Sequence, residues 1–278
     1  MNVLLKVQLL LTTILSLILL QPLFQGTNAT PTGNKILLNV DISAKPGYYI
    51  RNFPSTEFPR GIYYSARVGN RCQHAIGNVF DGPELIIPGD PNSITRSVLV
   101  VPREDGTKYV KVLTKYAGGP TRPVVNVLEF LRFPTNLHYV QIQRVHLDLD
   151  ILDFNHNQMI NAELLVNWQK HDEDVANGRA PMGIPENLET IPMKFTVQED
   201  MQDHFTIGVV KYNGRIVESR TDGLMSRQVT WEGGVRRPRI IILSRYVDNT
   251  EIKGRYEFSG TSGWSISHSN KKYLNLFL

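Results

Sequence analysis

The side chains best suited to do chemistry stand close together between positions 148 and 163. They are the carboxylates and amides of Asp148, Asp150, Asp153, Asn155, Asn157 and Glu163. Oxygen atoms of this kind are the ligands that Ca²⁺ prefers in proteins. Two interpretations follow from the spacing: a calcium-binding loop, or a β-strand that ends in a turn rich in Asp and Asn.

Part of this stretch fits a calcium loop of the EF-hand type. Asp153, Asn155 and Asn157 occupy the first, third and fifth positions of such a loop, and Ile160 supplies the apolar residue expected at the eighth. Over about a dozen residues, "DFNHNQMINAELL" resembles the calcium repeats of dockerins. The resemblance implies a calcium site at Asp153, Asn155 and Asn157.

Two other positions of the loop do not fit. Gln158 stands where Gly permits the sharp bend, and Leu164 stands where the loop needs a bidentate carboxylate. The preceding residues, 145–152, alternate between apolar and polar types, which is the period of a strand rather than a helix. We therefore favour a strand followed by an Asx-rich turn and expect no cofactor, with Ca²⁺ kept as the minor alternative.

Other catalytic patterns are missing from the sequence. The seven histidines are dispersed without metal-ligand spacing, the single Cys72 lacks a nucleophile motif, and neither a GxSxG elbow nor a phosphate-binding glycine loop occurs. A glycosidase needs two carboxylates across a sheet, for which Asp148 or Asp150 could pair with Asp81 or with 199–200. We expect a protein without enzymatic activity and retain a carbohydrate hydrolase as an alternative.

A basic cluster near the C-terminus is the best candidate for ligand binding. Arg236, Arg237 and Arg239 stand together, with Trp231 before them and Tyr246 after them. Arginines could bind sulfated glycans or another anionic surface, and aromatic rings could stack on sugars. The competing interpretation is a solvated turn whose arginines protect an apolar strand from aggregation. The partner predicted here is an extracellular glycan or a protein surface.

The first 29 residues have the layout of a secretory signal peptide. One Lys precedes an uncharged apolar run, and small residues follow up to a cleavage site after Ala29. An uncleaved membrane anchor is the alternative, and no later stretch is long enough to span a membrane. We therefore expect a secreted protein.

The net charge and the single cysteine further narrow the class of protein. The net charge of +4 is too small an excess to indicate a nucleic-acid partner. Cys72 cannot form an intramolecular disulfide, so the fold must be disulfide-free, and we expect this side chain to be buried as a small apolar group. An intermolecular disulfide is the alternative.

Period-two alternation dominates from residue 35 onward and predicts strands separated by Gly, Pro, Asn and Asp clusters. The expected strands are 35–42, 61–68, 97–102, 108–116, 124–133, 138–152, 191–199, 227–233, 237–247, 252–260 and 273–278. Residues 204–220 predict a hairpin that turns at Asn213-Gly214. Residues 161–178 are equally compatible with a helix and with a strand leading into a loop.

These patterns predict an all-β fold, an antiparallel β-sandwich or jelly roll with at most one or two short helices. We expect a boundary near 132–138, which gives a signal peptide at 1–29, a β-rich part at 30–135 and another at 136–278. Two tandem sandwiches and one large jelly roll explain the pattern equally well, and no residue-level repeat is detectable. The predicted function is a secreted binding or interaction protein; a structural, self-assembling protein is an alternative.

Overall fold

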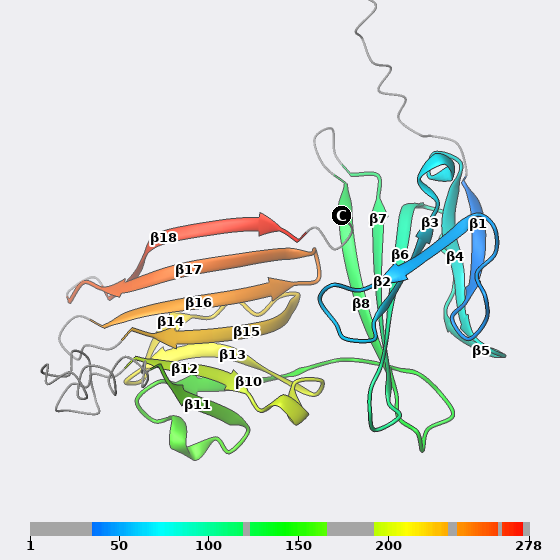
Figure 1. Ribbon diagram of the computed structural model, residues 1–278. Coiled ribbons are helices and arrows are strands. Elements are labelled where there is room, and N and C mark those ends of the chain that lie inside the picture. Colours follow the sequence, from blue (N-terminus) through cyan, green and yellow to red (C-terminus); the bar gives the residue numbers. More distant parts are fainter. Residues whose placement is uncertain (1–34, 119–122, 166–191, 233–237, 261–262, 275–278) are drawn as a thin grey trace, which may run out of the picture.

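The protein is an all-β molecule (Figure 1). The computed structural model describes residues 35–118, 123–165, 192–232, 238–260 and 263–274; the expected signal peptide, 1–29, lies outside these ranges. Within them the chain forms strands and single turns of 3-10 helix but no α-helix, so no helix there could cross a membrane. The predicted all-β sandwich class is confirmed.

Strand pairing divides the molecule into two groups, which we call the N-half and the C-half. The N-half contains β1 (Ile36–Asp41), β2 (Ile50–Pro54), β3 (Ile62–Ala66), β4 (His74–Asp81), β5 (Glu84–Ile87), β6 (Ser93–Pro102), β7 (Lys108–Tyr116), β8 (Val124–Arg132) and β9 (Val140–Gln141). The C-half contains β10 (Val145–Asp150), β11 (Ile160–Leu164), β12 (Met193–Val197), β13 (Phe205–Tyr212), β14 (Arg215–Glu218), β15 (Leu224–Trp231), β16 (Arg239–Tyr246), β17 (Thr250–Phe258) and β18 (Trp264–Tyr273). Because β9 pairs with β8, the pairing changes from one group to the other between Gln141 and Val145.

The two halves have the same strand connectivity. In the N-half, a three-stranded sheet of order β1-β4-β5 faces a six-stranded sheet of order β2-β3-β6-β7-β8-β9. In the C-half, the corresponding orders are β10-β13-β14 and β11-β12-β15-β16-β17-β18. Strand lengths and spacings match without a gap from β3 to β5 and from β12 to β14. Each half is therefore one sandwich, and the second repeats the first.

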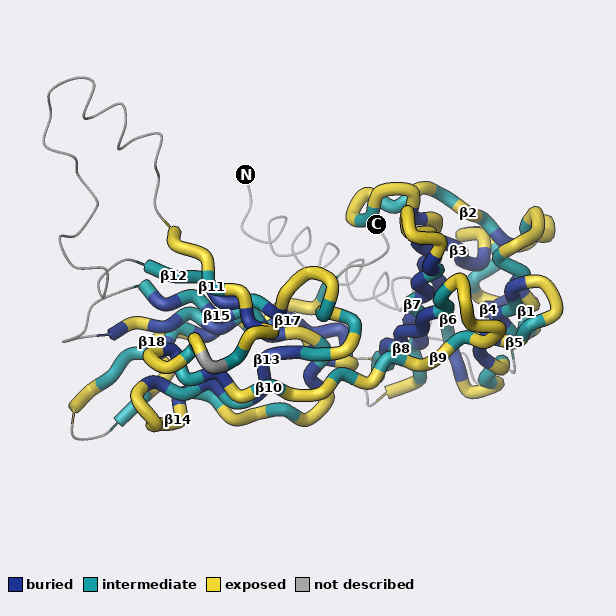
Figure 2. The backbone as a smooth tube through the Cα atoms, turned by 90° about the horizontal axis from the view of Figure 1, so that it is seen from below, coloured by how far each residue is buried: buried dark blue, intermediate teal, exposed yellow. Residues whose placement is uncertain are grey.

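Alternation along the strands fills the space between the two sheets of each half. Val98 and Val100 of β6 and Val110 and Val112 of β7 point inward onto the small sheet and form one core. The C-half has its own core, in which Phe195 is fully buried. Figure 2 shows the buried residues running along the strands, while most loops are exposed. A third cluster, of Tyr63, Leu99, Val101, Tyr109 and Leu131, lies on the outer face of the large N-half sheet. The separate cores show that each half buries apolar side chains of its own.

Each small sheet opens with a parallel pair, which the sequence patterns did not predict. β1 pairs with β4, and β10 pairs with β13, each with a bulge in the middle. At both bulges the chains approach so closely that only Gly fits. A Cβ atom on Gly77 would lie 2.9 Å from the Cβ of Leu37, and one on Gly208 would lie 2.7 Å from the Cβ of His146.

The predicted hairpin at 204–220 is confirmed as β13 and β14. Asn213 and Gly214 have φ values of 50° and 74°, as a type I′ turn requires. The carboxylate of Asp150, at the end of β10, accepts hydrogen bonds from the backbone N–H groups of both turn residues, at 2.9 and 2.6 Å. Asp41 at the end of β1 likewise accepts from the N–H of Gly82, at 3.0 Å, in the equivalent turn. These carboxylates hold the tight turns of the small sheets.

One end of the C-half abuts the outer face of the six-stranded sheet in the N-half, with the two sets of strands nearly perpendicular (Figure 1). The guanidinium of Arg103 donates hydrogen bonds to both carboxylate oxygens of Asp203 across the contact. The backbone N–H of Val127 donates to the carbonyl oxygen of Val247 at 2.8 Å. The ring of Phe133 in the N-half also stacks on His204 in the C-half, at 6.3 Å between ring centres. The halves thus meet through both polar and aromatic contacts.

Several local expectations were wrong. The strand expected at 138–152 is two strands, because β9 pairs with the N-half and β10 with the C-half. A strand that was not expected, β18, spans Trp264–Tyr273; residues 275–278 of the strand expected at 273–278 lie outside the described ranges. In the region 161–178, Ile160–Leu164 is a strand, and residues 166–178 lie outside the described ranges. Cys72 is exposed rather than buried, because it lies in the turn that precedes β4.

We predict that Gly208→Ala destabilises the protein by roughly 1–3 kcal/mol, because the new methyl group collides with His146. The free energy of unfolding in urea measures the effect. Gly69→Ala is the matched control, since a Cβ there meets nothing within 4 Å and should leave stability unchanged. Equal stability of the two variants would show that the parallel pair does not need Gly208.

Candidate functional site

The structure does not bring together at the surface those predicted binding residues that it describes. The side chain of Trp231 is 3% exposed within the core of the C-half, and Tyr246 is 5% exposed at the far end of the neighbouring strand. Arg239 forms an ion pair of 3.8 Å with Glu257. Arg236 and Arg237 lie outside the described residues. Trp231 therefore cannot stack on an external sugar in this arrangement, because the small sheet covers its ring.

The predicted calcium ligands also have structural partners. Asp150 holds the turn described above, Asp148 forms an ion pair of 2.8 Å with Lys211, and Asn157 accepts from the N–H of Met159 at 3.1 Å. Asp153 and Asn155 lie in or beside a single 3-10 turn, Phe154–His156. In the described ranges, no three His, Cys, Asp or Glu side chains are grouped so that they could hold a metal ion.

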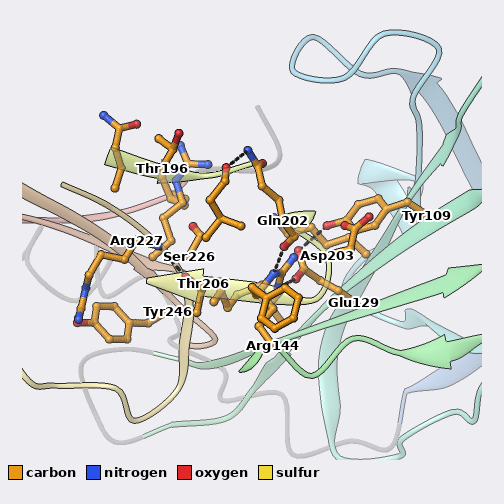
Figure 3. Close-up of a pocket in the computed structure, with 18 of the residues that line it drawn as sticks. Tyr109, Glu129, Arg144, Thr196, Gln202, Asp203, Thr206, Ser226, Arg227 and Tyr246 are labelled. Atoms are coloured by element: carbon orange, nitrogen blue, oxygen red, sulfur yellow. Dashed lines mark hydrogen bonds and ion pairs between the residues drawn. The ribbon is translucent and has the colours of Figure 1, made fainter. Parts of the chain in front are cut away.

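A cavity of about 420 Å³ lies where the two halves meet (Figure 3). The outer face of the N-half sheet supplies Tyr109 and Glu129, and the end of the C-half supplies Ser226 and Arg227. The hydroxyl of Tyr109 donates to Glu129 at 2.5 Å, and the guanidinium of Arg144 donates to the other oxygen of the same carboxylate at 2.5 Å. Polar groups linked by hydrogen bonds therefore cross a cavity that apolar side chains such as Phe58, Phe205 and Leu243 also line.

The charged groups of this cavity are largely matched to one another. Glu129 is paired with Arg144, Asp203 with Arg103, and Glu57 with Arg245 at 3.9 Å. Burial, followed by the charge of Glu129, raises the pKa of Tyr109 well above its ordinary value. Carboxylates held in ion pairs are poor candidates for a general acid, so this geometry gives the hydrolase alternative no support.

A smaller pocket of about 140 Å³ occurs at one end of the N-half, and it corresponds to part of this cavity. It is lined by Ser65, Ala66, Arg71, His74, Ala75, Thr95, Arg96, Ser97 and Lys115. The equivalent C-half residues, in the same order, are Thr196, Val197, Gln202, Phe205, Thr206, Ser226, Arg227, Gln228 and Arg245, and all of them line the larger cavity. The repeated fold thus builds the same pocket twice: the N-half covers the C-half copy, and no described residue of the C-half lines the N-half copy.

A buried arginine forms the floor of each pocket. Arg96 donates to the carbonyl oxygen of Gly77 at 2.9 Å and to the hydroxyl of Thr114 at 3.1 Å. Its equivalent, Arg227, donates to the carbonyl oxygen of Gly208 and to the hydroxyl of Ser244, the latter at 2.9 Å. Each guanidinium therefore ties the small sheet to the large one.

Around the N-half pocket lies a group of positive charges that we call the cationic end, at the top of the N-half in Figure 1. It consists of Lys35, Arg51, Arg67, Arg71, Arg96 and Lys115. None of these six side chains forms an ion pair with a carboxylate of the described residues; their hydrogen bonds go to carbonyl and hydroxyl oxygens instead. Tyr48 and Tyr49 border it and are 75% and 44% exposed.

Burial lowers the pKa of some of these side chains. Desolvation by burial, followed by repulsion from Arg51, lowers the pKa of Arg71. Desolvation likewise lowers the pKa of Lys35. Both effects disfavour the charged form. An anion placed among them would therefore be stabilised by charges that the described part of the protein leaves unneutralised.

The sequence interpretation missed this surface, although one signal was present. Residues 35–78 contain six Lys and Arg but only two Asp and Glu. The cationic residues are spread singly along the chain rather than clustered, unlike the run at 236–239. Only the fold shows that four of them, Lys35, Arg51, Arg67 and Arg71, converge.

Comparison with protein-family models, with curated proteins and with solved structures finds no match for this chain. The function is therefore inferred from the surfaces of the molecule.

We predict that Ca²⁺ at millimolar concentration leaves the melting temperature unchanged, because the carboxylates near the expected loop already hold the turn and Lys211. A ligand that binds the folded state alone would raise the melting temperature. A calcium-dependent rise that disappears in Asp153→Asn would restore the calcium loop.

Proposed function

We propose that this protein is a non-enzymatic extracellular binding protein that recognises an anionic ligand through its cationic end. The extracellular assignment rests on the signal-peptide pattern of residues 1–29 and on a fold that needs no reducing compartment. The observation that supports the binding role is the set of six cationic side chains that form no ion pair with any carboxylate of the described residues.

Charges elsewhere on the molecule are arranged differently. On the outer face of the C-half sheet, Arg255 lies between Glu232 at 2.8 Å and Glu257 at 3.7 Å. Alternating signs of this kind neutralise a solvated sheet face and leave little net field. At the cationic end no such alternation occurs, so the positive potential extends into solvent and would attract anionic ligands.

The aromatic side chains beside the cationic end add apolar contact area. The rings of Tyr48 and Tyr49 meet edge to face at 5.3 Å, and Tyr49 stacks on His74 at 4.9 Å. The guanidinium of Arg67 lies 4.9 Å from the centre of the Tyr48 ring. Exposed tyrosines and arginines held in fixed positions are typical of binding surfaces, because little side-chain entropy is lost when a ligand binds.

We expect the double variant Arg67→Glu, Lys115→Glu to elute from heparin, used as a polyanion probe, at clearly lower salt than the wild-type protein. Reversing two charges at the cationic end replaces attraction by repulsion. The matched control is Arg215→Glu, Lys253→Glu, which makes the same charge change on exposed residues of the C-half and should elute near the wild-type position.

A wild-type protein that is not retained by heparin would contradict the proposal. Equal shifts in the two double variants would also contradict it, since retention would then depend on net charge alone. If Arg239→Glu abolished retention while the cationic-end variant did not, the basic cluster at 236–239 would be the binding site instead.

A further inference from the structure

The contact between the two halves shows how this end of a sandwich recognises anionic groups. At the end of the C-half that the N-half covers, which we call the covered end, Arg144 pairs with Glu129 at 2.5 Å. Arg245 is held at 2.8 Å by Glu251 of its own half and also lies 3.9 Å from Glu57. In both contacts between the halves the cation belongs to the end of the C-half and the carboxylate to the N-half, where Glu129 lies on β8 and Glu57 lies in the loop between β2 and β3. The covered end therefore has two positions at which a cation of the C-half faces a carboxylate of the N-half.

The N-half has a cation at each of these two positions. Lys35 and Arg144 both directly precede the first strand of their half. The ammonium of Lys35 donates to the carbonyl oxygen of Arg71 at 2.6 Å, and the guanidinium of Arg144 donates to that of Gln202, the equivalent residue, at 2.7 Å. They therefore occupy the same place in the two halves.

Lys115 corresponds to Arg245 in the same way. Lys115 of β7 is opposite Thr95 of β6, and Arg245 of β16 is opposite Ser226 of β15. In the described part of the chain, no carboxylate forms an ion pair with Lys35 or Lys115. The N-half thus repeats both anion-holding positions without the anions.

Three further positions differ between the cationic end of the N-half and the covered end of the C-half. The difference indicates the class of ligand. Where the N-half has Arg51, Arg67 and Arg71, the C-half has Asn161, Gln198 and Gln202. A neutral amide suffices at the covered end, because the described part of the N-half brings only two carboxylates there, Glu57 and Glu129. Three additional guanidinium groups match a ligand with more negative charge per unit area than such a protein face.

We infer that the cationic end binds a sulfated glycan, with two of its anionic groups at Lys35 and Lys115 and others along Arg51, Arg67 and Arg71. This inference rests on the proposed function and specifies its ligand. Sulfated glycans carry closely spaced anionic groups on sugar rings, and Tyr48 and Tyr49 offer exposed aromatic faces for those rings. An acidic protein surface is the competing occupant.

The test compares the affinity of the full chain for two probes, a heparin-derived oligosaccharide and poly-L-glutamate of similar charge, by titration calorimetry. The triple variant Arg51→Asn, Arg67→Gln, Arg71→Gln gives the N-half the residues of the covered end. We expect it to bind the oligosaccharide at least about tenfold more weakly while changing poly-glutamate binding less. Lys35→Gln, Lys115→Gln should weaken binding of both probes.

The outcomes separate this inference from the proposed function. If the wild-type protein binds neither probe, the proposed function itself fails. Binding of poly-glutamate as tight as that of the oligosaccharide would assign the site to an acidic protein instead. Unchanged affinity in Lys35→Gln, Lys115→Gln would show that the two positions are not occupied by the ligand. Melting temperatures of all variants confirm that they are folded, and the single substitutions replace any variant that is not.

Discussion

The arrangement of each half depends on one buried arginine that joins its two sheets. Arg96 and Arg227 are each 4% exposed, and each donates hydrogen bonds to a backbone carbonyl of the small sheet and to a hydroxyl of the large one. A buried guanidinium is tolerated only where its donors are satisfied. This requirement fixes the end of each sandwich, and with it the surface that the surrounding side chains form.

The same end therefore exists twice, in two different environments. In the C-half it is covered by the N-half, Arg144 and Arg245 are paired with carboxylates, and amides stand where the other half has arginines. In the N-half it is not covered by the C-half, and its six cations have no carboxylate partner within the described residues. The two environments explain why equivalent positions carry different residues, and they locate the recognition surface at the N-half.

Local features of the fold could be predicted from the sequence, because neighbouring residues determine them. Strand β7 has the expected bounds, Lys108–Tyr116, and Asn213-Gly214 makes the expected turn. The parallel pairs could not be predicted, since they join strands that are distant in the chain and require a glycine at a contact formed only in the folded state. Cys72 was expected to be buried because free cysteines usually are, and this general preference does not show that the residue lies in an exposed turn.

The site was harder to predict than the fold. The run of arginines at 236–239 drew attention because it is contiguous, whereas Arg51, Arg71 and Lys115 are far apart in sequence and converge only at the end of the sandwich. Trp231 was expected at the surface, although it shares a strand face with Val229, and that alternation already indicated burial. Convergence from several strands is a property of the tertiary structure.

Hydrogen–deuterium exchange in the presence of a heparin-derived oligosaccharide tests the central claim most directly. The account predicts slower exchange of the backbone amides at residues 48–52 and 67–72, which surround the N-half pocket, and unchanged exchange at 250–258 in the C-half. Slower exchange confined to 239–246, or no change anywhere in the chain, would contradict it.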